Sequence, residues 1–140
     1  MYTPEQAYEL ILLMLCIWRE ARGEPMSAKH GVGWVIRNRA LKSGKSWWGD
    51  SYVGVILKPW QFSSFNPSDP NAAKFPMPDD PSFGECLLAA KHVYDGTAAD
   101  NTGGATSYYD DSIAANPPKW AATLTPSAKI GRLNFFKEPQ

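Results

Sequence analysis

The sequence predicts an α+β domain in which helices dominate and a small antiparallel sheet lies near the C-terminus. Helix-like segments with start and stop signals fill roughly the first two thirds of the chain, whereas strand-like segments appear only after them. Elements segregated in this way are typical of α+β domains. The 140 residues match the size of one domain, and no linker, repeat or low-complexity tract divides them. We therefore expect residues 1–140 to form a single domain.

The first helix is expected to begin at Pro4 and to end near Gly23. Thr3 can cap it, Pro4 suits its first position, and Gln6 completes a capping-box pattern. The run Leu10–Trp18 is apolar on nearly every side of a helix. Such a helix is typically central and buried.

Three further helices and two strand-like segments follow. The helices are expected at residues 27–42, 51–57 and 82–94, and the strand-like segments at 105–109 and 129–136. Gly31 and Gly33 cost stability within the second helix, which indicates close packing against a neighbour. Residues 58–81 are rich in Pro, Ser, Asn and Asp and predict a long ordered loop. A loop of this length inside a compact domain is usually functional.

The charge balance and the apolar runs argue against several partners. Basic and acidic residues number 14 each, so no polyanion-binding surface is indicated and a nucleic-acid partner is not expected. The run Leu10–Trp18 is shorter than the roughly 18 apolar residues that a membrane span needs. Glu5 and Glu9 precede it without a basic segment, so neither a signal peptide nor membrane insertion is expected. We expect synthesis in the cytoplasm, and release by other means if the protein acts outside the membrane.

The cysteines and histidines show no metal-ligand spacing. Cys16 and Cys86 each lie in an apolar helix-like stretch, which indicates buried free thiols, although a disulfide between them stays open. His30 and His92 fall in different predicted helices, far apart in sequence. We therefore expect neither a metal site nor a cofactor.

Glu20 is the leading candidate for acid–base chemistry. It lies in the last turn of the first helix and continues an apolar stripe that includes Cys16 and Ile17. Desolvation and the negative end of the helix dipole both raise the pKa of a carboxyl group there. A general acid needs a raised pKa near neutral pH. The alternative interpretation is an ion pair of Glu20 with Arg19 or Arg22.

Two segments carry side chains suited to sugars. In the loop, aromatic Trp60 adjoins Gln61 and Ser63, so a ring can stack on a sugar face while an amide and a hydroxyl bind its edge. In the strand at 105–109, Tyr108 and Tyr109 point to opposite faces, so one can line a cleft while the other packs inward. For the loop, folding over its own aromatics is the alternative.

The motifs occur in an order that resembles a known family. They are Glu20-Ala21-Arg22-Gly23-Glu24, Val35-Ile36-Arg37-Asn38-Arg39, Val55-Ile56-Leu57, Gln61-Phe62-Ser63, Gly103-Gly104-Ala105-Thr106 with Tyr108-Tyr109, and Ile130-Gly131 with Phe135. Taken together, over about residues 8–136, they resemble the SleB family of spore-cortex-lytic cell wall hydrolases.

The resemblance implies a lysozyme-like catalytic domain that cleaves peptidoglycan glycan strands between N-acetylmuramic acid and N-acetylglucosamine. It implies that Glu20, the first Glu of its motif, is the catalytic acid. Glu24 follows Gly23 just past the helix, where we expect it to face solvent or to cap the next helix. The family's Phe-Thr position falls on Phe62 and Ser63, where the hydroxyl is kept. Family members often carry His two residues after the Ile-Gly pair, but this chain has Leu133 there, so we assign no role to that position.

The resemblance also suggests a setting. A catalytic domain without a leader or a separate wall-binding domain resembles a phage endolysin, which a holin releases to the cell wall; a bacterial or prophage origin is the alternative. We expect a monomer whose partner is the peptidoglycan glycan strand.

The reaction type depends on whether a second carboxylate reaches Glu20. Glycosidases usually use two carboxylates, but here the other candidates fall in loops with no distinguishing spacing: Asp69, Asp79, Asp80, Asp100, Asp110 and Asp111. We therefore expect a lytic transglycosylase, in which the C6 hydroxyl of muramic acid attacks C1. Muramidase-type hydrolysis, a zinc-dependent peptidoglycan amidase and a noncatalytic sugar-binding module are the alternatives.

Overall fold

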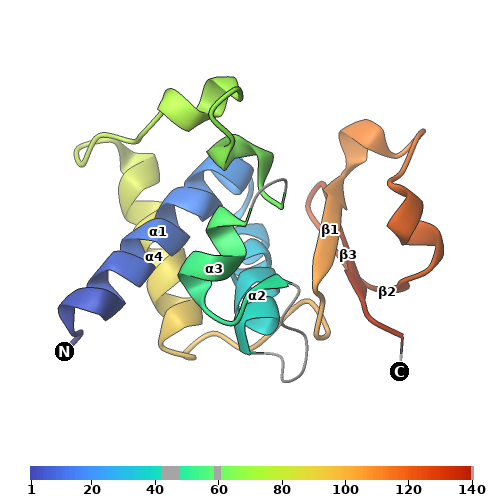
Figure 1. Ribbon diagram of the computed structural model, residues 1–140, viewed down its shortest axis with the longest axis horizontal. Helices are drawn as coiled ribbons and strands as arrows, with labels where there is room; N and C mark the ends of the chain where they lie inside the picture. The colour runs from blue at the N-terminus through green and yellow to red at the C-terminus, as the bar shows by residue number, and fades with distance from the viewer. Residues whose placement is uncertain (42–47, 59–60, 140) are drawn as a thin grey trace.

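The computed structural model describes residues 1–41, 48–58 and 61–139. In this part of the chain, helices form one side of the molecule and a three-stranded sheet forms the other (Figure 1). The α-helices are α1 (Pro4–Ala21), α2 (Met26–Leu41), α3 (Tyr52–Leu57) and α4 (Pro81–Tyr94), and the strands are β1 (Ser107–Asp110), β2 (Thr125–Ile130) and β3 (Leu133–Lys137). The predicted helix-dominated α+β class is confirmed.

Helix α1 begins at the predicted cap. The Thr3 side chain accepts a hydrogen bond from the backbone N–H of Gln6, and the Gln6 side chain accepts one from the backbone of Thr3. Its buried side packs on α4, and the side chains of Leu13 and Ile17 are fully buried. Ile11 is 40% exposed, however, so the helix is central without being covered on every side.

Helix α2 joins the helical side to the sheet. A Cβ atom on Gly31 would lie 2.6 Å from Cζ of Phe135 in β3, and a Cβ on Gly33 would lie 2.9 Å from Cγ2 of Val93 in α4. Only glycine fits at these two positions without displacing a buried neighbour. The predicted close packing is therefore confirmed, and it fixes the sheet against the helices.

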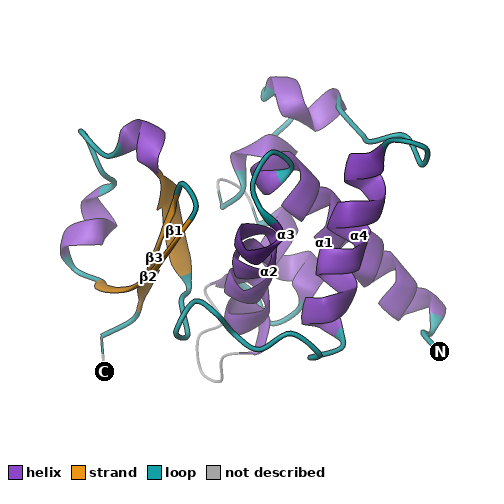
Figure 2. Cartoon of the chain, turned by 180° about the vertical axis from the view of Figure 1, so that it is seen from behind, coloured by secondary structure: helices purple, strands orange, loops and turns teal. Residues whose placement is uncertain are grey.

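The sheet has the antiparallel order β1-β3-β2, with Tyr108 opposite Phe135. The prediction of one strand over 129–136 is wrong, because Gly131 adopts a left-handed backbone (φ 55°) and turns the chain between β2 and β3. Strand β2 also begins earlier than predicted, at Thr125. Figure 2 shows the resulting sheet from behind, beside the helices.

The described part of the long loop between α3 and α4, residues 61–80, is ordered, as predicted. It contains the 3₁₀ helices η2 (Ser63–Phe65) and η3 (Pro70–Ala73). The guanidinium of Arg19 donates hydrogen bonds of 3.0–3.3 Å to the backbone carbonyls of Ser64, Ala72 and Lys74. One side chain of α1 thus holds this loop over the end of its own helix.

The cysteines are buried free thiols, as expected. The histidines, 62 residues apart, come together because α2 packs on α4, and Nε2 of His30 lies 3.0 Å from Nδ1 of His92. Among the described residues, no group of three His, Cys, Asp or Glu side chains is placed to hold a metal ion. Within those same residues, none of the helices is both long and apolar enough to cross a membrane.

Candidate active site

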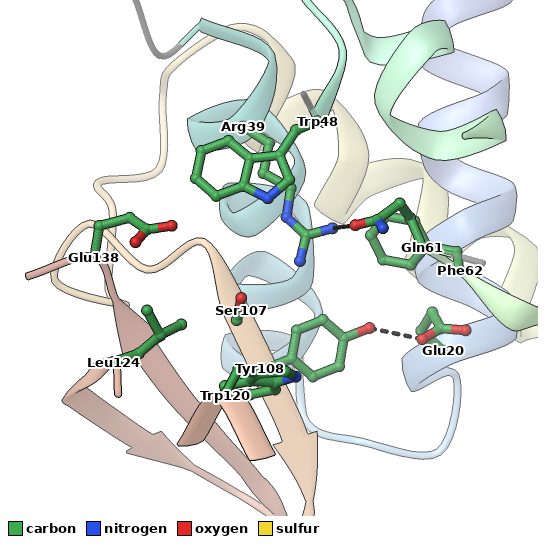
Figure 3. Close-up of a pocket in the computed structure, with 10 residues that line it drawn as sticks. All are labelled: Glu20, Arg39, Trp48, Gln61, Phe62, Ser107, Tyr108, Trp120, Leu124 and Glu138. Carbon is green, nitrogen blue, oxygen red and sulfur yellow. Dashed lines mark hydrogen bonds between the residues drawn. The ribbon is translucent and has the colours of Figure 1, made fainter. Parts of the chain in front are cut away.

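A cavity of about 550 Å³ opens between the helices and the sheet (Figure 3). Segments far apart in sequence meet there: the end of α1, the last turn of α2, the start of the long loop, and β1. The lining residues are Glu20, Arg39, Trp48, Gln61, Phe62, Ser107, Tyr108, Trp120, Leu124 and Glu138. Three of the predicted site residues, Glu20, Gln61 and Tyr108, are thus brought together.

Glu20 is held by a tyrosine from the opposite side of the cavity. The Tyr108 hydroxyl donates a 2.7 Å hydrogen bond to Oε1 of Glu20. Burial raises the pKa of Glu20, while the hydroxyls of Tyr108 and Ser64 act to lower it and the charge of Asp69 acts to raise it. The net shift is upward, the direction expected for a group that must keep a proton near neutral pH.

The two arginines beside Glu20 are engaged elsewhere. Arg19 binds the loop carbonyls, and its guanidinium lies 4.5 Å from the ring centre of Phe65. Arg22 stacks 4.3 Å from the ring centre of Trp18 and donates to the Trp18 carbonyl. In the described structure neither forms an ion pair with Glu20, which disfavours the alternative interpretation of this carboxylate.

The hydroxyl next to Glu20 belongs to Ser64 rather than to Ser63. Ser64 is 2% exposed, and its Oγ makes no hydrogen bond of standard geometry among the described residues. It nevertheless lies close enough to Glu20 to lower the pKa of that carboxyl. Ser63 is exposed at the start of η2, and its predicted contact with substrate stays a prediction. Trp60, also predicted to bind substrate, lies outside the described residues.

The two tyrosines divide as the strand alternation predicts. Tyr108 faces the cavity, whereas the ring of Tyr109 stacks 5.6 Å from that of Phe136 and lies 6.2 Å from that of Trp120. Tyr109 thus supports the far side of the sheet. Its predicted place beside the substrate is not in this cavity.

Glu24 secures a turn of the chain. Its Oε1 accepts a 3.0 Å hydrogen bond from the backbone N–H of Arg132, and its backbone carbonyl accepts one from Nζ of Lys29. These contacts tie the β2–β3 turn to the start of α2. They favour a structural role over a catalytic one.

Sequence reasoning missed two charged residues of the cavity. Arg39 is 8% exposed, and its guanidinium lies between the rings of Trp48 and Phe62, 5.9 and 5.4 Å from their centres. Glu138 follows β3, where no pattern singled it out. Arg39 ends one of the motifs that resemble the family, but a helical arginine is usually a solvated one.

The six aspartates considered as a second carboxylate do not line this cavity. Five are bound elsewhere. Asp69 and Asp80 cap η3 and α4, Asp100 accepts bonds from Thr102, and Asp110 and Asp111 pair with Arg132 and Lys129. The other carboxylate of the cavity is that of Glu138, which Figure 3 places at the opposite end from Glu20.

A carboxyl group with a raised pKa, set in a cavity lined by aromatic rings, an amide and a hydroxyl, is the arrangement expected in a glycosidase-type enzyme. The comparison with known families specifies the class. The sequence model of the cell wall hydrolase family matches residues 23–136, so the chain belongs to that family. Glu20 lies just before the matched segment.

Two solved structures share the fold. The catalytic domain of the Bacillus cereus SleB protein is 25% identical, with a TM-score of 0.74 over 98% of this chain and 93% of that one. The catalytic domain of the germination-specific lytic transglycosylase SleB from Bacillus anthracis is 24% identical, with a TM-score of 0.69 over 97% of each chain. These matches confirm the resemblance to SleB. No curated protein matches the sequence significantly.

Proposed function

We propose that this enzyme cleaves peptidoglycan glycan strands between N-acetylmuramic acid and N-acetylglucosamine, with Glu20 as the general acid. The observation that carries the proposal is the Glu20 carboxyl itself, buried enough to raise its pKa and fixed by Tyr108 at the edge of a sugar-sized cavity. Membership of the cell wall hydrolase family supports the substrate.

We infer that the reaction is a transglycosylation within the substrate. Glu20 donates its proton to the glycosidic oxygen as the bond from C1 to that oxygen breaks. The C6 hydroxyl oxygen of the muramic acid then bonds to C1, and its proton returns to the Glu20 carboxylate. The product ends in 1,6-anhydromuramic acid, and no water is consumed. Because Tyr108 engages Oε1, we expect Oε2 to face the substrate.

The position of the other carboxylate supports this route. Glu138 lies across the cavity, with Arg39 and Ser107 between it and Glu20 in Figure 3. The SleB relative from Bacillus anthracis is described as a lytic transglycosylase, which agrees with a mechanism of this kind.

Hydrolysis is the second candidate, because Glu138 lines the same cavity and a carboxylate can activate a water molecule. Mass spectrometry of products formed in ¹⁸O-labelled water distinguishes the two. Anhydro ends without label are expected, and labelled reducing ends that disappear in Glu138→Gln would establish hydrolysis instead. Activity that survives prolonged chelation would further separate both routes from a zinc amidase.

Where the enzyme acts and in which oligomeric state stay predictions. We infer a single catalytic domain that acts as a monomer on the wall after release from the cytoplasm, as a phage endolysin does. Lysis on co-expression with a holin, and its absence without one, would support that setting, and light scattering of the purified protein would test the monomer.

A further inference from the structure

Arg39 is a buried cation without an acidic partner. Among the described residues no carboxylate lies within ion-pair distance of its guanidinium, although the residue is 8% exposed. Buried charges are costly unless they are paired or bind a ligand. Burial lowers the pKa of Arg39, and the more distant groups Tyr108, Cys16 and Glu138 act in the opposite direction.

The guanidinium is fixed in one orientation. Its Nε–H donates a 2.6 Å bond to the Thr106 carbonyl, and Nη1 makes a long 3.4 Å contact with Oε1 of Gln61. Its Nη2 has no acceptor in the described part of the chain. In Figure 3 this group projects from the wall of the cavity toward Tyr108, in the space between Glu20 and Glu138. Arg39 thus presents oriented donors to the cavity that Glu20 also lines.

The charges of the cavity favour an uncharged acceptor. Glu138 lines the same cavity without forming an ion pair with Arg39, and its carboxylate would repel a negatively charged ligand. Ser107 is another lining residue of the cavity, and its hydroxyl, which forms no hydrogen bond with another described residue, can accept one. A donor and an acceptor that line the same cavity are complementary to the carbonyl and the N–H of an amide group.

We propose that Arg39 binds the carbonyl oxygen of an acetamido group on the sugar in this cavity, while Ser107 accepts the N–H of the same group. The inference rests on the proposed function, because the acetamido group is the uncharged amide that every sugar of the glycan strand carries. Arg39 is therefore a substrate-binding residue that makes the enzyme selective for N-acetylated strands.

The test compares one glycan preparation, freed of stem peptides, in three states: N-acetylated, N-deacetylated, and chemically re-acetylated. For the wild type, deacetylation should lower kcat/KM by roughly 10- to 100-fold, as expected for the loss of a hydrogen bond to a charged group. Re-acetylation should restore it. Equal cleavage of acetylated and deacetylated strands, or a loss that re-acetylation does not reverse, would overturn the proposal.

Variants then assign the selectivity to the arginine. In Arg39→Gln the acetylated and deacetylated strands should be cleaved at similar rates. Arg39→Lys should show an intermediate selectivity, because the single ammonium group of lysine cannot bind the Thr106 carbonyl and the substrate with separate nitrogens as a guanidinium does. Arg37→Lys is the matched control: Arg37 bonds the Val93 carbonyl on α4 outside the cavity and should keep the wild-type ratio. Full selectivity in Arg39→Lys would contradict the proposal even if Arg39→Gln fails to fold. No cleavage of acetylated strands by the wild type would instead refute the proposed function.

Discussion

Replacing Glu20 with glutamine should lower activity and raise stability at the same time. Glutamine keeps the shape of the side chain, and its carbonyl oxygen can still accept the bond from Tyr108, while its amide can donate to the unpaired Oγ of Ser64. The fold should therefore survive. The lost proton donor should cost roughly 10²- to 10⁴-fold in kcat.

The gain in stability follows from the direction in which the pKa moves. Burial raises the pKa of Glu20 above its ordinary value of 4.5, so the folded state holds this proton more tightly than the unfolded state does. The stability of the wild type should therefore fall as pH rises from about 4.5 through the pKa of Glu20 in the folded state. The total loss should be about 1.4 kcal/mol for each tenfold difference in proton affinity between the folded and unfolded states. Glutamine does not titrate, so the advantage of the variant should be absent at pH 4 and largest above neutrality.

Urea unfolding followed by tryptophan fluorescence at several pH values measures this difference, and product release from purified peptidoglycan measures the activity. Glu24→Gln is the matched control, because glutamine keeps the acceptor for the Arg132 N–H and the residue lies outside the cavity. It should leave activity within a few-fold of wild type. An active Glu20→Gln enzyme, or one less stable than wild type at pH 8, would refute the reasoning.

Three further changes test the surroundings of Glu20 and the fold. Tyr108→Phe removes a hydrogen bond that lowers the pKa of Glu20, so the alkaline limb of the kcat/KM profile should move to higher pH, and stability at neutral pH should fall by roughly 1.5–3 kcal/mol. An unmoved limb would contradict the proposed role of Glu20. Ser64→Ala should move the same limb upward by less, whereas Ser63→Ala should not move it, since Ser64 is the one of these two serines whose hydroxyl lowers that pKa. The opposite ranking would favour Ser63 as the family's hydroxyl. The pKa of His30 is lowered first by burial and then by the charge of His92, so the stability of the folded protein should decline as pH falls below about 6.5. In His30→Asn, thermal melts between pH 5 and 7.5 should show a flatter decline.

Local signals predicted the parts of the site that lie on one element. The apolar stripe of α1 predicted where Glu20 lies and in which direction its pKa moves, and the alternation of β1 predicted that only one of its paired tyrosines faces the cavity. These patterns depend on the period of a helix or a strand, which the sequence contains.

The remaining features depend on how elements meet. Which of Ser63 and Ser64 places its hydroxyl near Glu20 depends on how a single 3₁₀ turn is rotated, and no periodic pattern in the sequence determines that rotation. Arg39 is buried only because Trp48 and the long loop close over it, and Glu138 reaches the cavity only because β3 pairs with β1. Such contacts join residues far apart in the chain, so local patterns in a single sequence do not predict them.

The close approach of Gly31 to Phe135 connects a glycine of α2 to the site around Glu20. Phe135 stands opposite Tyr108 in the sheet, with their ring centres 5.7 Å apart, and the Tyr108 hydroxyl donates a hydrogen bond to Glu20. The missing side chain at position 31 therefore sets the spacing between the two halves of the enzyme. A single methyl group added there would displace the Phe135 ring and, through it, Tyr108. Gly31→Ala should therefore change the proton affinity of Glu20 and lower activity by more than the loss of packing alone would cause.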